Sequence, residues 1–287
     1  MKKRLLAAAG FLKKNFVPIG LVLLLFIGLC VLLYPVVSDY INARHQSRVV
    51  AQYFLDMTKM SGAESEQMLA DAESYNERLS QNQYRWHLTE ADKKEYNALL
   101  NIRNTSIMGV VEIPKIGVKL PIYHGTSTGV LQLGLGHFEG SSLPVGGIGT
   151  HTVITGHRGL PSSTLLTRLD KLEIGDTFAL NVVNRVMTYQ VDQILVVLPD
   201  EMFALAIDPK MDYCTLMTCT PLGQNTHRLL ARGHRVTEEE AQAASQTVSA
   251  DARALGKPAV AMALFAPAFA AVMVYVIVKY RKSLKRK

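Results

Sequence analysis

A cysteine and an arginine lie nine residues apart in the β-rich part of the chain. Cys219 ends the stretch TLMTC, and Arg228 begins the next apolar run, RLLA. A cysteine thiolate is a strong nucleophile, and a nearby guanidinium stabilises negative charge on the thiolate or on the oxyanion formed by its attack. If the two stretches are neighbouring antiparallel strands, the short connection 221–225 returns Arg228 close to Cys219. The spacing therefore favours a nucleophile with an electrostatic partner.

A general acid or base is the missing part of such a site, and histidine is the usual choice. His157 follows the β-branched run THTVIT (Thr150–Thr155) inside a glycine-flanked turn, where loop residues carry chemistry on a rigid scaffold. His151 starts the same run and His234 lies within an expected strand, which favours structural roles for both. The remaining candidates are His124, His137 and His227. The residues alone thus predict an acyl-transfer site made of Cys219, His157 and Arg228.

Structural roles for the same residues stay open at this point. A lone cysteine in an apolar strand is usually a core residue, as we expect of Cys214, and Arg228 alone is equally a surface or salt-bridged residue. A zinc site from Cys214, Cys219, His227 and His234 has poor spacing, because both cysteines would have to point the same way. Five positions apart on one strand, the two cysteines should lie on opposite faces, which also disfavours a disulfide. At least one of them is expected to be a free thiol.

Two long apolar stretches frame this segment in a chain of 287 residues. Val17–Val37 has no charge, and a second run extends from Pro258 to Val278; each is long enough to cross a hydrocarbon core of about 30 Å. The first run is too long for a signal peptide and lacks a good cleavage site, so we expect an uncleaved anchor. Basic residues flank both runs on their outer sides, which predicts two cytoplasmic termini. These basic residues exceed the whole net charge of +7, so the high pI reflects membrane topology and not nucleic-acid binding.

The segment between the two runs has a helical part followed by a β-rich part. Residues 39–106 are polar and helix-prone, with a break at Ser61-Gly62 and a capping-box signature at Thr89–Asp92. From Met108 onward, short β-rich stretches separated by glycine and proline predict a barrel or sandwich. The expected strands are Gly109–Ile113 (limited by Pro114 and Pro121), Thr150–Thr155, two strands within Asp176–Leu198 around a turn near Asn184, Asp212–Thr220 and His227–Val236.

The cysteine and histidine motifs resemble those of sortases, especially the class C group that polymerises pilins. TLMTC followed by THRLLARGHR resembles the active-site strands of the family, and GHFEGSSLPVGGIGTHTVITGHRGLP (Gly136–Pro161) is similar to its histidine block, with His157 in the TGHRG turn. MGVVEIPKI (Met108–Ile116) resembles the first barrel strand. The two-span layout is also what class C members show. The resemblance implies a mainly β fold: an eight-stranded sortase β-barrel with short helices, an N-terminal helical segment and two transmembrane helices.

The resemblance implies a role for each matching residue. Cys219 would attack the Thr–Gly carbonyl of an LPXTG-like sorting signal to give a thioester. His157 would protonate the leaving amine and deprotonate the incoming one, and Arg228 would hydrogen-bond the oxyanion or hold the substrate. Thr218 is a weaker candidate for substrate contact, with an ordinary strand threonine as the alternative. This chemistry requires no metal or organic cofactor.

The segment ahead of the barrel departs from the class C pattern. Class C sortases commonly carry a lid with an Asp-Pro-aromatic motif, whereas SQNQYRWHLTEADKKEY (Ser80–Tyr96) has no Asp-Pro. Trp86, the only tryptophan, is an aromatic plug candidate for a lid near residues 82–92, or else an aromatic that simply packs on the barrel. Arg85 would repel Arg228 if it approached. We therefore expect weaker autoinhibition than in members that carry the motif.

The expected organisation combines topology, composition and resemblance. Its parts are a cytoplasmic basic N-terminus (1–16), a transmembrane helix (17–38), the helical segment (39–106), the sortase barrel (107–237), a linker (238–257), a second transmembrane helix (258–278) and a cytoplasmic basic tail (279–287). The expected protein is a two-span bacterial membrane enzyme whose catalytic domain faces the cell wall. Its partners would be pilin or surface-protein substrates with LPXTG-like signals and the acceptor lysine of a pilin, with no nucleic acid. The alternatives are a sortase that anchors proteins to peptidoglycan, a membrane-tethered cysteine protease, and a non-enzymatic scaffold in which Cys219 is core.

Overall fold

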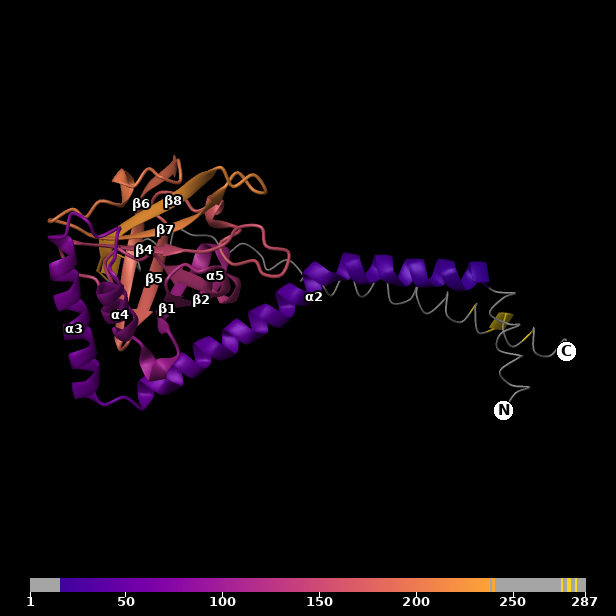
Figure 1. The fold of residues 1–287 in the computed structure, drawn as a ribbon, viewed down its shortest axis with the longest axis horizontal. Helices are drawn as coiled ribbons and strands as arrows, with labels where there is room; N and C mark the ends of the chain where they lie inside the picture. Colours follow the sequence, from indigo (N-terminus) through magenta and orange to yellow (C-terminus); the bar gives the residue numbers. More distant parts are fainter. Residues whose placement is uncertain (1–15, 238, 241–274, 276–277, 280–281, 283–287) are drawn as a thin grey trace. The chain divides into compact units, whose positions relative to one another are not determined.

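The computed structural model describes residues 16–237, 239–240, 275, 278–279 and 282 (Figure 1). The helical part precedes the strands, as the sequence predicts. The α-helices are α2 (Phe16–Thr58), α3 (Gly62–Ser80), α4 (Glu90–Ala98) and α5 (Thr128–Leu133). Short 3₁₀ turns are η1 (Ile102–Asn104), η2 (Pro114–Ile116), η3 (Leu169–Lys171) and η4 (Phe203–Leu205).

The strands close into a barrel with the order β1-β2-β3-β4-β7-β8-β6-β5. They are β1 (Ile107–Ile113), β2 (Val118–His124), β3 (Leu135–His137), β4 (Thr150–Thr155), β5 (Thr177–Val182), β6 (Arg185–Val197), β7 (Asp212–Thr220) and β8 (His227–Val236). The predicted eight-stranded barrel is confirmed, and β4, β7 and β8 have the predicted bounds. Neighbouring strands in the sheet are antiparallel except for β2 with β3 and β4 with β7.

Two strands and one helix were not predicted from the sequence pattern. Strand β2 runs through Pro121, which we expected to limit strand structure in this region. Its neighbour β3 pairs with β2 only from Ile122 onward, so the edge at Pro121 tolerates a residue without an N–H group. Strand β3 has three residues and α5 has six, which is too short for a clear hydrophobic period.

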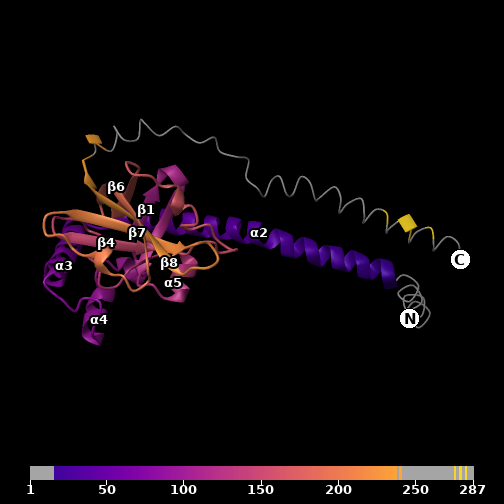
Figure 2. The same cartoon turned by 90° about the horizontal axis from the view of Figure 1, so that it is seen from above.

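The N-terminal helices begin at recognisable caps. The Ser61 side chain accepts a hydrogen bond from the backbone N–H of Glu64 at the start of α3. Thr89 and Asp92 form the predicted capping box at the start of α4, each side chain accepting from the other residue's backbone N–H. Figures 1 and 2 show α3 and α4 next to each other at one flank of the barrel.

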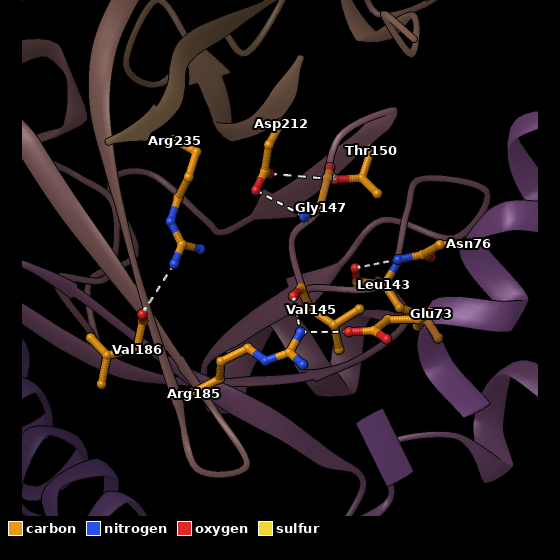
Figure 3. A network of polar contacts seen from close by, with 10 residues as sticks. All are labelled: Glu73, Asn76, Leu143, Val145, Gly147, Thr150, Arg185, Val186, Asp212 and Arg235. Carbon is orange, nitrogen blue, oxygen red and sulfur yellow. Dashed lines mark hydrogen bonds and ion pairs between the residues drawn. The ribbon is translucent and has the colours of Figure 1, made fainter. Parts of the chain in front are cut away.

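Helix α3 holds the long loop that leads into β4 (Figure 3). Asn76 donates from Nδ2 to the carbonyl oxygen of Leu143 (3.0 Å) and accepts from the Leu143 N–H at Oδ1 (2.7 Å). From the barrel side, Asp212 at the start of β7 accepts a hydrogen bond from the Gly147 N–H (2.8 Å). The loop's backbone is therefore hydrogen-bonded on two sides, and β4 starts from a defined position.

Tyr53 joins the later part of α2 to the barrel. Its hydroxyl accepts from the Val183 N–H (2.8 Å) in the β5–β6 turn and donates to the Met108 carbonyl oxygen (3.3 Å) in β1. Burial raises the pKa of Tyr53, so the phenol stays neutral. These bonds fix the helical segment to the barrel that carries the motifs.

The described residues divide into two compact units, and the boundary along α2 lies between Asp39 and Tyr40. By length and composition, α2 is apolar enough to cross a membrane, and no residue of its most apolar stretch is buried. The predicted linker and second span fall almost wholly outside the described residues.

Candidate active site

The pairing of β7 with β8 brings Cys219 and Arg228 together. In this antiparallel ladder, Cys219 lies directly opposite Arg228, and both residues are half-buried. Residues opposite each other in such a pair have Cα atoms about 5 Å apart. The guanidinium uses Nη1 to donate to the carbonyl oxygens of Asn225 (3.2 Å) and His227 (3.1 Å), which keeps the arginine at the mouth of the β7–β8 loop.

The parallel pairing of β4 with β7 brings His157 to the same level. Thr155, the last residue of β4, pairs with Met217, so two further residues along each chain lead to His157 and Cys219. The Gly156 N–H donates to the Met217 carbonyl oxygen (3.1 Å), which carries the pairing one residue beyond the strand. Burial lowers the pKa of His157. A neutral imidazole is the form that accepts a proton, so this environment suits a general base.

Thr218, the weaker candidate, is only 1% exposed. Its hydroxyl donates to the Gly156 carbonyl oxygen (2.7 Å), next to His157. Side chains alternate along a strand, so Cys219 points to the face opposite Thr218. The observed contact of Thr218 therefore links the cysteine strand to the histidine turn.

An apolar floor lies on the face of the sheet that carries Cys219. It is defined by the buried residues Val153, Val197, Leu205, Met217 and Leu230. Met217 precedes Cys219 by two residues on the same face, and Leu230 pairs with Met217. These residues form a small buried apolar cluster on the outer face of the sheet, next to the strand position of the thiol.

Trp86 packs on the apolar floor and against Phe138, with ring centroids 5.6 Å apart. Arg85 does not direct its charge at Arg228. Its guanidinium donates to the carbonyl oxygens of Gly140 (3.0 Å) and Leu205 (2.9 Å) and lies 4.1 Å from the Trp86 ring centroid. Sequence reasoning did not find this anchor, because its acceptors are backbone carbonyls and carry no residue signature.

Gly140 makes the close approach of this segment possible. A Cβ atom at this position would lie 2.4 Å from the Arg85 carbonyl oxygen and 2.8 Å from the Trp86 ring, and φ is +87°. Only glycine accepts both the contact and the left-handed backbone without strain. The 82–88 segment is thus seated on the barrel by Arg85, Trp86 and Gly140 together.

Two other histidines and the second barrel cysteine have structural environments. His137 bonds to Tyr96 and to the Ser142 carbonyl oxygen, and His151 bonds to the Ala206 carbonyl oxygen and to Thr215. Cys214 is fully buried in the barrel core, as predicted, and all three cysteines are free thiols. Burial raises the pKa of the Cys214 thiol well above its usual value, so this cysteine stays protonated. Within the described part of the chain, no three His, Cys, Asp or Glu side chains converge as metal ligands.

We expect acid to destabilise the fold between about pH 6.5 and pH 4. Burial lowers the pKa of His137 and of His151 to about 4, whereas an unfolded histidine titrates near 6.5. The unfolded chain binds protons first, so the free energy of unfolding falls as the pH drops through this window, by roughly 3 kcal/mol per histidine at most. Urea unfolding of the full chain in detergent at pH 7.5, 6 and 5 measures the slope, which His151→Gln should flatten. An unchanged midpoint across these pH values would contradict the expectation.

Comparison with known proteins agrees with this fold. A family model described as "Sortase domain" matches residues 111–236. Sortase C1 from Streptococcus agalactiae superposes with a TM-score of 0.64 at 48% identity, covering 67% of this chain and 99% of that one. Sortase C from Streptococcus pneumoniae superposes with a TM-score of 0.60 at 42% identity, covering 66% and 97%. Sortase D from Bacillus subtilis is 32% identical over 132 residues, which span 45% of this chain and 64% of that protein.

The closed eight-stranded barrel sets Cys219 opposite Arg228, and the pairing of β4 with β7 leads to His157 at the same level. The chain belongs to the sortase family of cysteine transpeptidases. The solved relatives named here are class C sortases.

Proposed function

We propose that this protein is a membrane-anchored class C sortase. It cleaves an LPXTG-like sorting signal between threonine and glycine and transfers the acyl group to a pilin lysine. The register pair Cys219–Arg228 carries the proposal, because it sets a nucleophile beside a cation at the end of the histidine turn. Further support comes from the similarity to the sortase C of S. pneumoniae, whose structure is reported to give insights into catalysis and pilin substrate specificity.

In the first half-reaction, His157 accepts the proton of the Cys219 thiol, and the resulting thiolate adds to the threonine carbonyl carbon. Arg228 donates hydrogen bonds to the resulting oxyanion. When the C–N bond breaks, His157 gives its proton to the leaving glycine amine, and the acyl group stays on sulfur as a thioester. In the second half-reaction, a lysine amine attacks the thioester, His157 takes up the proton, and the thiolate leaves as the isopeptide bond forms.

The apolar stretch of α2 and the flanking basic residues support placement in the bacterial cell membrane, with the barrel on the cell-wall side. In this arrangement both termini are cytoplasmic and the run 258–278 is a second span. The substrates are then met outside the cell, where pilins and surface proteins emerge.

Removing the Trp86 side chain is expected to speed thioester formation about three- to tenfold. Trp86 covers the apolar floor, and its ring must leave before a peptide can contact the same residues. The matched control is His87→Ala, which alters an exposed neighbour in the same segment. Stopped-flow acylation of the full chain in detergent measures the rate. A Trp86→Ala protein that acylates at the wild-type rate or more slowly would contradict a lid role.

Product analysis separates this function from its alternatives. The full chain is incubated with an LPXTG-type peptide alone, with a pilin-derived lysine peptide, or with a cell-wall precursor amine. The proposal predicts an isopeptide product with the lysine peptide as the main species. A preference for the cell-wall amine would indicate peptidoglycan anchoring, and hydrolysis that ignores both amines would indicate a protease.

A further inference from the structure

Arg158, the residue after His157, connects three parts of the barrel. Its Nη1 donates to the Thr220 hydroxyl (3.0 Å), and its Nη2 forms an ion pair with Asp170 in η3 (3.1 Å). The arginine side chain is only 10% exposed. A largely buried cation needs a nearby counter-charge, and Asp170 supplies it.

These contacts complete a set of bonds on both sides of the histidine and the cysteine. Before His157, Gly156 is bonded to Met217 and Thr218, which precede Cys219. After His157, Arg158 is bonded to Thr220, which follows Cys219. His157 and Cys219 therefore lie between two sets of hydrogen bonds that join the histidine turn to β7. The His157 carbonyl oxygen itself accepts from the Leu166 N–H (3.3 Å).

Arg158 contacts Thr220 and Asp170 at the same time through two different nitrogens, and a lysine has only one nitrogen for both contacts. A guanidinium presents donors in fixed, diverging directions, whereas an ammonium is a single point charge on a flexible stem. The buried Nε of Arg158 has no hydrogen-bond partner within the described residues. Leaving a buried donor unpaired is costly, and such exceptions in a folded protein call for an explanation. The unpaired Nε is explained if the Arg158 side chain is held in this position to constrain the neighbouring His157.

We propose that the Arg158–Thr220 bond, held by Asp170, positions His157 against Cys219 for proton transfer. This inference rests on the proposed function and extends it, because it assigns positioning roles to Arg158, Thr220 and Asp170. None of the three touches the reacting atoms. They act by fixing the distance between a general acid–base and a nucleophile, where a shift of about 1 Å costs up to about 100-fold in rate.

Thr220→Val tests the bond, and Thr220→Ser is its matched control. Valine removes the acceptor and leaves the Arg158–Asp170 ion pair in place, whereas serine keeps the hydroxyl. With the full chain in detergent, Thr220→Val is expected to lower kcat for peptide transfer about tenfold or more, with KM within about twofold. Thr220→Ser is expected to stay within about threefold of wild type. Thermal unfolding, measured alongside, reports any general loss of stability.

A second readout does not depend on any substrate. The pH dependence of Cys219 alkylation by iodoacetamide, followed by peptide mapping to exclude Cys30 and Cys214, reports how the histidine affects the thiol. The Thr220→Val profile is expected to move toward that of His157→Ala, and the Thr220→Ser profile to match wild type. A Thr220→Val protein with wild-type kcat and a wild-type profile overturns the inference. So does a protein whose unfolding temperature falls while its alkylation profile does not move.

The peptide-transfer rate and the alkylation profile distinguish a failure of the positioning role from a failure of the proposed function. If wild-type protein transfers none of the sorting-signal peptides, the proposed function fails. The positioning role then stands or falls on the alkylation profiles alone, because these need only Cys219, His157 and the bonds around them.

Discussion

Replacing Cys219 with alanine is expected to lower the rate of peptide transfer by about 10⁴-fold or more, without unfolding the protein. The sulfur is the only atom at this position that can form the acyl intermediate. Because Cys219 is half-buried at the end of β7, outside the two buried clusters, its loss leaves no large core cavity. The thermal unfolding midpoint should therefore stay within about 2 °C of wild type. Turnover and unfolding are measured on the full chain in detergent.

Cys214→Ala is the matched control, because it removes a thiol from the opposite face of the same strand. This cysteine is fully buried, so its truncation should lower stability by about 1 kcal/mol while turnover per folded molecule is kept. A Cys219→Ala protein that retains a few per cent of wild-type turnover would contradict a covalent role for this residue. A Cys214→Ala protein without turnover would point to the wrong cysteine.

Replacing Arg228 with glutamine is expected to lower kcat by about 10²- to 10³-fold, with a smaller change in KM. A charged donor opposite the nucleophile stabilises the oxyanion more than the carbonyl from which it forms, so its loss affects the transition state more than binding. Arg228→Lys keeps the positive charge but loses the planar guanidinium with its several fixed donors. Its rate should therefore lie between those of Arg228→Gln and wild type. Single-turnover acylation separates the effect on chemistry from the effect on binding.

Arg235→Gln controls for the loss of one positive charge from β8, seven residues farther along the strand. Arg235 donates to the Val186 carbonyl oxygen (3.3 Å) and lies near Asp212, at the other end of the barrel (Figure 3). Its replacement should leave kcat within about twofold of wild type. If kcat fell equally in Arg228→Gln and Arg235→Gln, the effect would come from the lost positive charge on the protein and not from the position of Arg228. A change confined to KM would make Arg228 a substrate-holding residue.

The strands that carry the site were the easiest to predict, for a physical reason. Thr150–Thr155, Asp212–Thr220 and His227–Val236 are rich in β-branched or apolar residues and end at glycine, proline or polar loops. Both their type and their bounds are therefore local properties of the sequence. The nine-residue spacing of Cys219 and Arg228 then places them opposite each other once the strands pair.

The parts that escaped prediction depend on contacts distant in the chain. Strand β3 is three residues long and exists because β2 and β4 lie on either side of it. Strand β2 passes through Pro121, which local rules treat as a stop. Short elements and proline-containing strands are decided by their neighbours in space, which a pattern along one segment does not contain.

The surroundings of the site were harder to predict than its central residues. Arg85 is placed by two backbone carbonyls, and Arg158 by a threonine 62 positions away and by Asp170. The TGHRG turn itself pointed to His157 but gave no partner for the arginine that follows it. Trp86 was considered as a plug or as a packing residue, and the structure seats it on the apolar floor beside the cysteine strand.

The most direct test of the central claim is intact mass spectrometry of the full chain after incubation with an LPXTG-type peptide. We predict an adduct whose mass corresponds to the peptide without its C-terminal glycine portion, formed by wild type and Trp86→Ala and absent from Cys219→Ala. Hydroxylamine should remove it, as expected of a thioester. No adduct on either wild type or Trp86→Ala, or an adduct that persists in Cys219→Ala, would contradict acyl transfer through Cys219.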